Sequence, residues 1–373
     1  MIDLYGNRSN ETYTYRLVDW GTWQEGADLG SVVSGSVELS ALSDLKASLT
    51  MSWKGEAPPR GSLVRVYYSF DDEAGEHAEF AIGTFLLSYS EATYVENRGT
   101  LASSGSADGH SVLKVLQDRI LGMPLEVGAG EQPVAKAVEA MESMGLRVDV
   151  SEESGYTLSA GHVFDPTDTM LAYVNWCLTA AGYQAVFPDA YGVCRVAPYV
   201  EPSSRAVVAS FADDGNSIMY PEVDESNSWR GTPNVVRAYY EDEACAMYAV
   251  ARNVSGGLAS LEANGMREVT RYEAVSEADG LAALEAHALK VLLDNSNEIE
   301  RVKLAHPYVP IAAFDSVRID YSDRSWSGNV QNMVVHLSPS TKCETTLRRF
   351  TSPAIVAEVE GGVLWEAEGG GAS

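Results

Sequence analysis

Three short acidic clusters are the residues of this sequence best suited to chemistry. Asp71-Asp72-Glu73, Asp213-Asp214-Gly215-Asn216 and Glu241-Asp242-Glu243 could supply oxygen ligands for Ca²⁺ or the paired carboxyl groups of a glycoside hydrolase. Each cluster follows a run with the composition of a β-strand, however, and acidic residues are common in turns. The second cluster also lacks the alternating Asp positions and the late Glu of an EF-hand loop. We therefore expect neither a catalytic residue nor a metal ligand among them.

The histidines, serines and cysteines are not spaced for catalysis either. The 6 His residues form no His-x-x-x-His or His-Glu-x-x-His motif of a helical metal site. Gly30-Ser31-Val32-Val33 and Ser104-Gly105-Ser106-Ala107 depart from the Gly-x-Ser-x-Gly pattern of a nucleophile elbow, and neither a phosphate loop nor a dinucleotide fingerprint is present. The 4 Cys residues lie far apart, which favours reduced, mostly buried thiols. The sequence thus predicts a protein that is not an enzyme and that needs no cofactor.

The 7 Trp residues keep a binding function open, because aromatic rings can stack on sugars. Trp53 lies in an alternating strand pattern and Trp176 in a helical pattern, so both are expected in the core. Trp326 lies in the polar segment 321–328 and is predicted to be free for a partner. A carbohydrate-binding or host-adhesion module of a phage tail is therefore the alternative function, and a hydrolase of unrecognised family is a further one.

Composition excludes a nucleic-acid clamp. The chain of 373 residues carries 26 Lys and Arg against 53 Asp and Glu, a formal net charge of -27, which repels phosphates. This charge is consistent with solubility alone, and it is also consistent with a surface past which DNA moves without binding. The N-terminal residues lack the basic start and apolar run of a secretory signal, and no stretch is apolar enough for a membrane helix. We expect no membrane insertion.

Alternation of period two predicts antiparallel strands over residues 1–105. Apolar and small residues alternate with polar ones from Val33 to Ala41, where Ser34, Ser36, Glu38 and Ser40 share the wet face, and again through Ser48, Thr50 and Ser52. Runs rich in Val, Tyr, Phe and Leu follow at 63–70 and 80–89. Residues 103–109 are small and are expected to form a linker.

Helical spacing replaces the alternation over residues 106–202. Apolar residues recur at helical spacing within 112–120 and within 134–144, and the second helix is expected to end at Gly145. A third helix is predicted to start with Asp165 as its cap and Pro166 at its first position, and to end at Gly182. This region is expected to be a small α/β domain with three helices.

The strand pattern returns over residues 203–352, with one helix inside it. Ser276-Glu277-Ala278-Asp279 resembles a capping box, and Leu281, Leu284 and Ala288 follow it at helical spacing. Residues 353–373 are expected to form a flexible C-terminal tail, because glycine, acid and alanine dominate from Gly361 onward.

The order of these elements and several local phrases resemble the tail-hub family of phages, which includes baseplate hubs of contractile tails and tail-tip hubs of non-contractile tails. The resemblance spans about residues 30–350. Its phrases are Ser43-Asp44-Leu45-Lys46 before an alternating strand, Leu63-Val64-Arg65-Val66-Tyr67-Tyr68, Ile82-Gly83-Thr84-Phe85-Leu86, Asn234-Val235-Val236, the helix from Glu277, and Phe314-Asp315-Ser316-Val317-Arg318-Ile319.

The resemblance implies a mainly β, α+β fold, with two tail-tube-like β-barrel domains, 1–105 and 203–352, and an inserted α/β domain, 106–202. It implies a homotrimer that forms a ring at the virion tail tip, assembled in the host cytoplasm. The implied partners are the tail tube or distal tail protein, the tape-measure protein and the tip or receptor-binding proteins, with DNA only passing through the lumen. The wet strand faces are expected to give that lumen a net negative surface.

Four residues are the predicted assembly contacts. Two segments have similar sequences: Val64-Arg65-Val66-Tyr67-Tyr68 and Val236-Arg237-Ala238-Tyr239-Tyr240. The similarity can arise by chance, because strands favour Val and Tyr. It can also indicate two copies of one β unit. Tyr67 and Tyr239 are chosen from these strands, and Arg324 and Trp326 from the hairpin near residue 325. Family hubs often continue into a peptidase, lysozyme or receptor-binding region, and we expect neighbouring proteins to supply those functions here.

Overall fold

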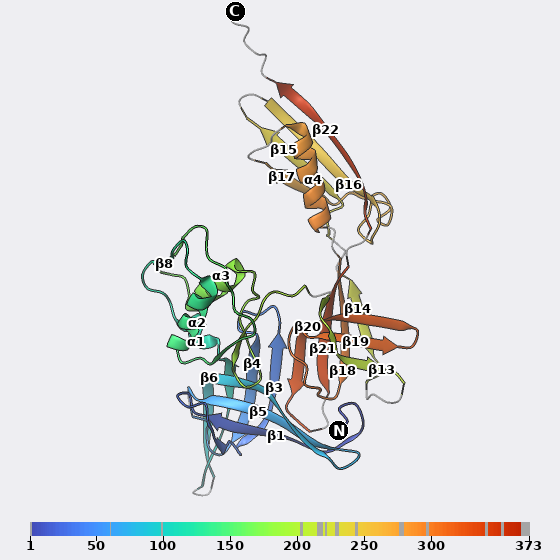
Figure 1. Cartoon of the computed structure of the whole chain (residues 1–373). Helices are drawn as coiled ribbons and strands as arrows, with labels where there is room; N and C mark the ends of the chain where they lie inside the picture. Colours follow the sequence, from blue (N-terminus) through green and yellow to red (C-terminus); the bar gives the residue numbers. More distant parts are fainter. Residues whose placement is uncertain are drawn as a thin grey trace, which may run out of the picture. The chain divides into compact units, whose positions relative to one another are not determined.

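The computed structural model consists of two compact units (Figure 1). Unit 1 comprises residues 1–223 and 303–347, and unit 2 comprises residues 224–302 and 348–373. The predicted region 203–352 is thus divided between the two units. The structure describes residues 2–366 apart from 60, 98–99, 202–203, 215–218, 221, 228–230, 243–244, 276–279, 296–297, 340–341 and 352–353.

One long sheet makes up most of unit 1, and its strands come from both ends of the sequence; residues 224–227, 298–302 and 348–351 of its strands are assigned to unit 2. The strand order is β14-β18-β21-β20-β3-β4-β7-β6-β5-β1-β2, with β19 beside β20 and β13 beside β19. The N-terminal strands are β1 (Arg8–Val18), β2 (Glu25–Asp28), β3 (Val32–Ser40), β4 (Ala47–Lys54), β5 (Leu63–Asp72), β6 (His77–Asn97) and β7 (Thr100–Ser111). The later strands are β13 (Val207–Ala212), β14 (Val223–Asn227), β18 (Glu298–His306), β19 (Ser316–Tyr321), β20 (Arg324–His336) and β21 (Cys343–Thr351).

The pairing of β20 with β3 joins the two groups of strands. Met333 lies opposite Leu39, and Val335 lies opposite Val37, in an antiparallel register. The described strands therefore follow one open path from β14 to β2, and no closed barrel occurs among them. The prediction of a mainly β, α+β fold is confirmed, whereas two separate barrels are not.

Strand β7 includes the segment 103–109, so the predicted linker there is wrong. Ser104, Ser106 and Asp108 pair in register with β4, and the same strand pairs with β6 on its other side. A Cβ at Gly105 would clash with the backbone carbonyl of Glu91 on β6 and would lie 2.7 Å from the ring of Trp53, so the glycine allows close packing here rather than flexibility.

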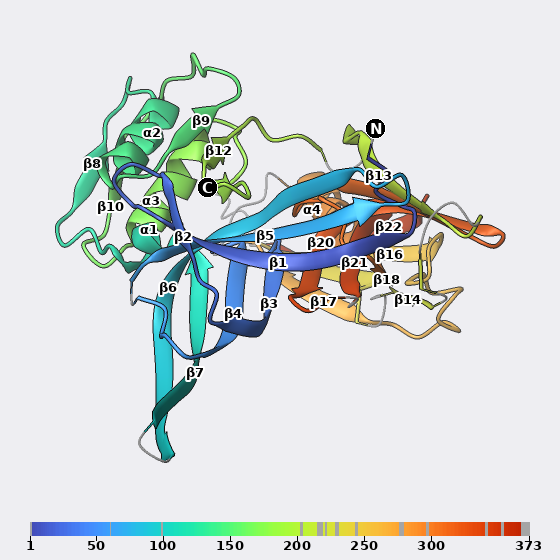
Figure 2. The ribbon, with the colours of Figure 1, turned by 90° about the horizontal axis from the view of Figure 1, so that it is seen from below.

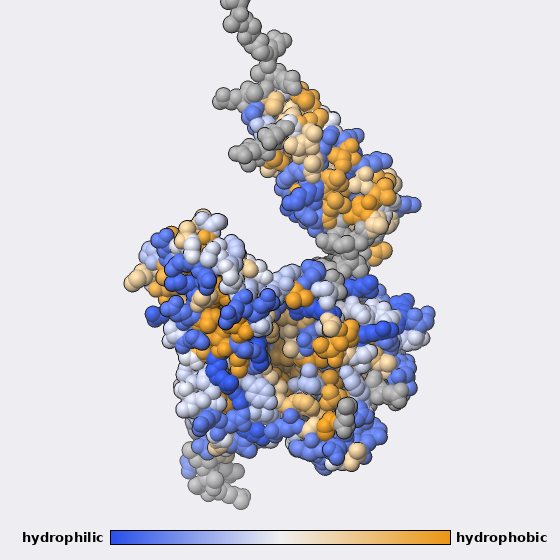
Figure 3. All heavy atoms as spheres, in the orientation of Figure 1, coloured by the Kyte–Doolittle hydropathy of each residue, from blue (hydrophilic) through white to orange (hydrophobic). Residues whose placement is uncertain are grey.

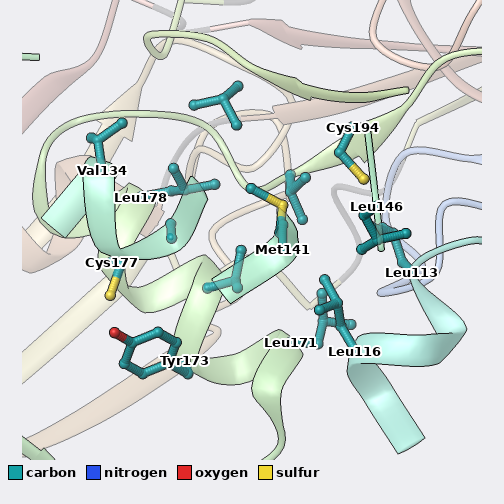
Figure 4. Close-up of a cluster of buried hydrophobic side chains, with 14 of the residues drawn as sticks. Leu113, Leu116, Val134, Met141, Leu146, Leu171, Tyr173, Cys177, Leu178 and Cys194 are labelled. Atoms are coloured by element: carbon teal, nitrogen blue, oxygen red, sulfur yellow. The ribbon is translucent and has the colours of Figure 1, made fainter. Parts of the chain in front are cut away.

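The α/β module of unit 1 lies within the predicted region 106–202. It contains α1 (Lys114–Asp118), α2 (Pro133–Ser143), α3 (Met170–Ala180), β8 (Leu125–Val127), β9 (Val148–Val150), β10 (His162–Phe164), β11 (Phe187–Pro188) and β12 (Cys194–Val196). Figure 4 shows how its helices interlock through buried side chains such as Leu116, Met141 and Leu178, each at 0% exposure. Val18 and Leu63 of the sheet belong to the same cluster, so the module shares its core with β1 and β5.

Helix α3 begins later than predicted. Asp165 and Asp168 form a turn ahead of the helix, in which the Asp165 amide donates to the Asp168 carboxylate at 2.9 Å. Thr169 is the cap instead, because its hydroxyl accepts from the amide of Ala172 at 3.2 Å, a contact that stabilises a helix start by about 1 kcal/mol. The predicted helix ends are correct: Gly145 and Gly182 have φ angles of +79° and +77°.

Unit 2 is a four-stranded sheet with one helix. Its strands are β15 (Val235–Glu241), β16 (Cys245–Ser255), β17 (Thr270–Ala274) and β22 (Val356–Glu366), in the order β17-β15-β16-β22, and its helix is α4 (Leu281–Asn295). Leu284, Ala288 and Leu292 are fully buried where α4 packs on one face of the sheet (Figure 1). The predicted capping box at 276–279 lies outside the described residues.

The predicted flexible tail is wrong over Val356–Glu366, because these residues form β22, which pairs antiparallel with β16. Its two glycines provide space. A Cβ at Gly361 would lie 2.8 Å from Leu281 of α4, and one at Gly362 would lie 2.9 Å from the ring of Tyr248. Glycine here reflects close packing against a strand rather than mobility.

Candidate functional site

Strands β20, β3, β4, β7 and β6 of unit 1 share one polar face. The register places Ser36 between His336 and Thr50, and Thr50 lies opposite Asp108. The opposite face of the same strands is core, with Val37, Leu49, Met51, Trp53, Met333 and Val335 all at 1% exposure or less. We call the following set the polar face: Ser34, Ser36, Glu38, Ser40, Ser48, Thr50, Ser52, Lys54, Glu91, Thr93, Ser104, Ser106, Asp108, His110, Asn332, Val334 and His336.

Most side chains of the polar face are short hydroxyls, and its charge is mainly negative. Glu38 accepts a hydrogen bond from the Asn332 amide at 3.2 Å, and Asp108 accepts one from the Thr50 hydroxyl at 3.3 Å. Neither carboxylate has an ion-pair partner in the described part of the chain. Glu91 adds a third carboxylate and Lys54 one ammonium group. The face can hold water and repel anions, but its described side chains do not form a catalytic arrangement.

The hairpin of β6 and β7 extends beyond the rest of the sheet. Their pairing continues to Asn97 and Thr100, whereas β4 follows β7 only as far as Ser104. Figure 2 shows this hairpin projecting as a two-stranded arm. Tyr94 and Val95 on the arm are 62% and 55% exposed. An isolated two-stranded ribbon is only marginally stable in water, so we regard the arm as a candidate assembly surface.

Tyr67, one of the predicted contact residues, is buried rather than exposed. Its hydroxyl donates to the carboxylate of Glu25, which also pairs with the guanidinium of Arg65. Partial burial opposes the shift, yet the hydrogen bonds from Tyr67 and Arg65 lower the pKa of Glu25. Arg65 is 4% exposed and also donates to Thr84 at 2.9 Å and to the Tyr191 carbonyl at 3.0 Å. This network fixes β2 and the α/β module to the sheet.

A cavity of about 190 Å³ lies beside this network, between β6, the segment 187–190 and the segment 308–313. Figure 3 shows the surface of unit 1 hollowed between the α/β module and β20, with apolar residues gathered in the hollow. Lys46 and Asp189 are the charged residues that line the cavity. These few charged groups do not form a catalytic constellation.

The other predicted contacts lie at separate places. Trp326 is 8% exposed, so the prediction that it is free for a partner is wrong. It lies opposite Ile319 on the buried face of the β19–β20 hairpin, whereas Ser325 and Ser327 are exposed. Arg324 is exposed at the end of the β19–β20 hairpin. Tyr239 of unit 2 is half-buried, and its hydroxyl donates to Glu241 at 2.6 Å. The structure does not bring these residues together.

The acidic clusters form turns where they are described. Asp72 accepts the backbone amides of Ala74 and Glu76 at 2.9 Å each, and the pKa of Asp72 is lowered by such backbone hydrogen bonds. Asp242 accepts the amide of Cys245 at 2.8 Å. No group of three His, Cys, Asp or Glu side chains able to hold a metal occurs among the described residues, and none of the described helices is long and apolar enough to cross a membrane.

The sequence predicted the part of the polar face that lies on β3 and β4. The alternation of β3 and β4 is visible as Ser and Thr at every second position, but β7 was hidden because its glycines resemble a linker. No disulfide joins the four cysteines, all of which lie in the described part of the chain, and Cys177, Cys194 and Cys343 are buried, as predicted.

Solved structures show which class of protein has this fold. The chain is similar to a tail protein from Neisseria meningitidis, with a TM-score of 0.58 and 14% identity over 91% of this chain and 97% of that one. It is also similar to the 43 kDa tail protein of prophage MuSo2 from Shewanella oneidensis, with a TM-score of 0.57 and 10% identity over 92% and 98%. The chain therefore has the fold of phage tail proteins, as the sequence resemblance predicts. No protein-family model and no curated protein matches the sequence.

Proposed function

We propose that this chain is a structural tail hub protein without enzymatic activity, which forms a homotrimeric ring at the tail tip. The ring joins the tail tube or distal tail protein to the tip or baseplate. The polar face of unit 1 carries this proposal, since its Ser- and Thr-rich surface suits the wall of a DNA channel. The fold likeness supports it because the alignments span nearly the whole of this chain and of both tail proteins.

A channel wall must hold water and release DNA, and the polar face meets both needs. Hydroxyl side chains stay hydrated without adding charge. Glu38 and Asp108 have no ion-pair partner in the described residues, so they repel phosphates at close range, within a Debye length of about 10 Å at 0.1 M salt. Lys and Arg contacts, which dominate the affinity of DNA-binding proteins, are scarce on this face.

Ring closure accounts for the open sheet of one chain. Two tail-tube-like regions per chain would give a trimer six such units around the channel, and the sheet path of unit 1 leaves edges that neighbouring chains can continue. The projecting β6–β7 arm is the element best placed to reach a neighbour. The tape-measure protein and the tip or receptor-binding proteins are the further partners, and DNA only passes through the lumen.

Light scattering and cryo-electron microscopy of the purified chain test this proposal. We expect a mass three times the 40.2 kDa of one chain, and a ring whose lumen is lined by Ser36, Thr50 and Asp108. A protein that stays monomeric at high micromolar concentration, both alone and with its distal tail partner, would contradict the ring.

A further inference from the structure

The sheet of unit 2 has one face that α4 does not cover. Val236 and Ala238 of β15, with Ala249 and Ala251 of β16, point toward α4 and are almost fully buried. The intervening residues point to the opposite face. Leu261, in the segment after β16, packs on Val235 and Val250 at one end of that face.

Four aromatic residues cross the remainder of this face as a diagonal stripe. Tyr239 lies opposite Tyr248 across β15 and β16, and Tyr272 lies beside Arg237 on β17, two residues along β15 from Tyr239. Trp365 on β22 lies opposite Ala246, two residues along β16 from Tyr248. The stripe therefore places one aromatic side chain on each of four adjacent strands.

The rings of the stripe are accessible, and at least one lies flat. Tyr272 is 71% exposed, Trp365 41% and Tyr248 37%, while Tyr239 is half-buried. The Tyr248 ring lies over Gly362 of β22, where any side chain would lie within 2.9 Å of it. Because glycine leaves this space, the ring can lie along the sheet and present its face to solvent.

Two arginines beside the stripe are each paired with a carboxylate. Arg237 pairs with Glu268 at 3.1 Å, and Arg252 pairs with Glu360 at 2.8 Å. The Tyr239 hydroxyl is bound by Glu241 at 2.6 Å. Among its described residues the surface offers aromatic faces and hydrogen-bonding groups but no unpaired cation for a phosphate or sulfate, and the net charge of -27 disfavours an acidic ligand.

We propose that this stripe binds a neutral, linear polysaccharide of β-linked pyranoses. Such sugars have apolar ring faces that stack on aromatic rings and equatorial hydroxyls that bond to flanking polar groups. The stripe crosses four strands about 4.8 Å apart and runs diagonally over them, so an extended oligosaccharide lying along the diagonal can meet several of its rings. This inference goes beyond the hub role and does not depend on ring formation.

Calorimetric titration of the full chain with chitotetraose and cellotetraose tests the stripe. We expect one of the two tetrasaccharides to bind with a Kd of about 1 mM or tighter, and its monosaccharide at least tenfold more weakly. Tyr272→Ala and Trp365→Ala should each weaken binding by about tenfold or more. The matched control is Tyr156→Ala, which removes an exposed tyrosine of the α/β module in unit 1 and should leave both the affinity and the oligomer unchanged.

Two results would overturn the glycan site. One is the absence of binding by both tetrasaccharides to a chain whose circular dichroism and thermal unfolding show it to be folded. The other is a loss of oligomer mass, without a change in glycan affinity, in Tyr272→Ala and Trp365→Ala, which would make the stripe a contact between copies of the chain. Ring formation by the wild type is measured separately, so failure of this proposal leaves the hub proposal standing.

Discussion

Thr50 and Asp108 face each other across β4 and β7, and the Thr50 hydroxyl donates to the Asp108 carboxylate at 3.3 Å. The pair shows how the polar face is built: a short hydroxyl on one strand holds a carboxylate on the next, and no cation neutralises it among the described residues. The alternation of β3 and β4 buries the other face, so the sequence can keep a hydrated, negative surface without weakening its core.

Reversing the charge of the polar face should make the protein bind DNA. Glu38→Lys combined with Asp108→Lys adds ammonium groups to a surface that now repels phosphates, so duplex DNA should bind and then dissociate as salt is raised. Fluorescence anisotropy at 50 and 200 mM salt measures this. The control Glu139→Lys with Glu142→Lys makes the same charge change on the exposed side of α2. Equal DNA binding by both double variants would show that net charge alone matters.

Removing Arg65 should destabilise unit 1. Arg65→Ala leaves the Glu25 carboxylate without its buried partner and takes donors from Thr84 and the Tyr191 carbonyl. Since Glu25 keeps partial contact with water, we expect the free energy of unfolding to fall by about 2 kcal/mol rather than the larger cost of a fully buried pair. Urea denaturation measures the loss. Arg119→Ala, at an exposed position, should change stability by less than about 0.5 kcal/mol.

His306 should make the protein less stable in mild acid. Its ring is fully buried beside Thr345 and Phe211, and burial lowers the pKa of His306 from 6.5 to about 4, with the nearby Arg8 charge acting in the same direction. The folded state favours the neutral ring, so this contribution to stability is complete above pH 6.5 and is lost progressively as the pH falls from 6.5 toward 4.

Between pH 7 and pH 5 this one group should remove about 2 kcal/mol from the free energy of unfolding, because only the unfolded chain takes up the proton. The His306→Gln variant, measured by urea denaturation at the same two pH values, should lack that part of the change. Identical pH dependence in the variant and the wild type would assign the acid sensitivity to other groups.

The β6–β7 arm should be needed for assembly but not for folding. Tyr94→Asp with Val95→Asp places charges on two exposed large apolar residues of the arm, so a neighbouring chain could no longer cover them without a desolvation cost. Sedimentation velocity should show monomers in place of trimers, with an unchanged melting temperature. Tyr156→Asp changes an exposed tyrosine of the α/β module and should leave the oligomer intact.

Local patterns predicted much of the fold because strand alternation and helix ends are local properties. The alternation from Ser34 to Ser40 predicted a half-buried strand, which is β3 in the structure. Gly145 and Gly182 predicted helix ends, and α2 and α3 end just before these positions. The start of α3 was missed because Asp165 and Thr169 are both good caps, and only the turn geometry distinguishes them.

Long-range pairing was beyond the reach of the sequence. The pairing of Val335 with Val37 joins strands about 300 residues apart, a separation that no local periodicity encodes. For the same reason β22 was not predicted: its glycines are explained by the side chains of α4 and Tyr248 that pack on them, and these are distant in sequence. Trp326 was misassigned because a polar neighbourhood in sequence does not show which side of a strand faces the core.

A cryo-electron microscopy map of the assembled protein will show which residues line its channel. We expect a threefold ring whose channel is lined by the polar face, with Ser36, Thr50 and Asp108 directed at the lumen and a net negative inner surface. A ring with this face buried between subunits or turned outward, or with a basic lumen, would contradict it.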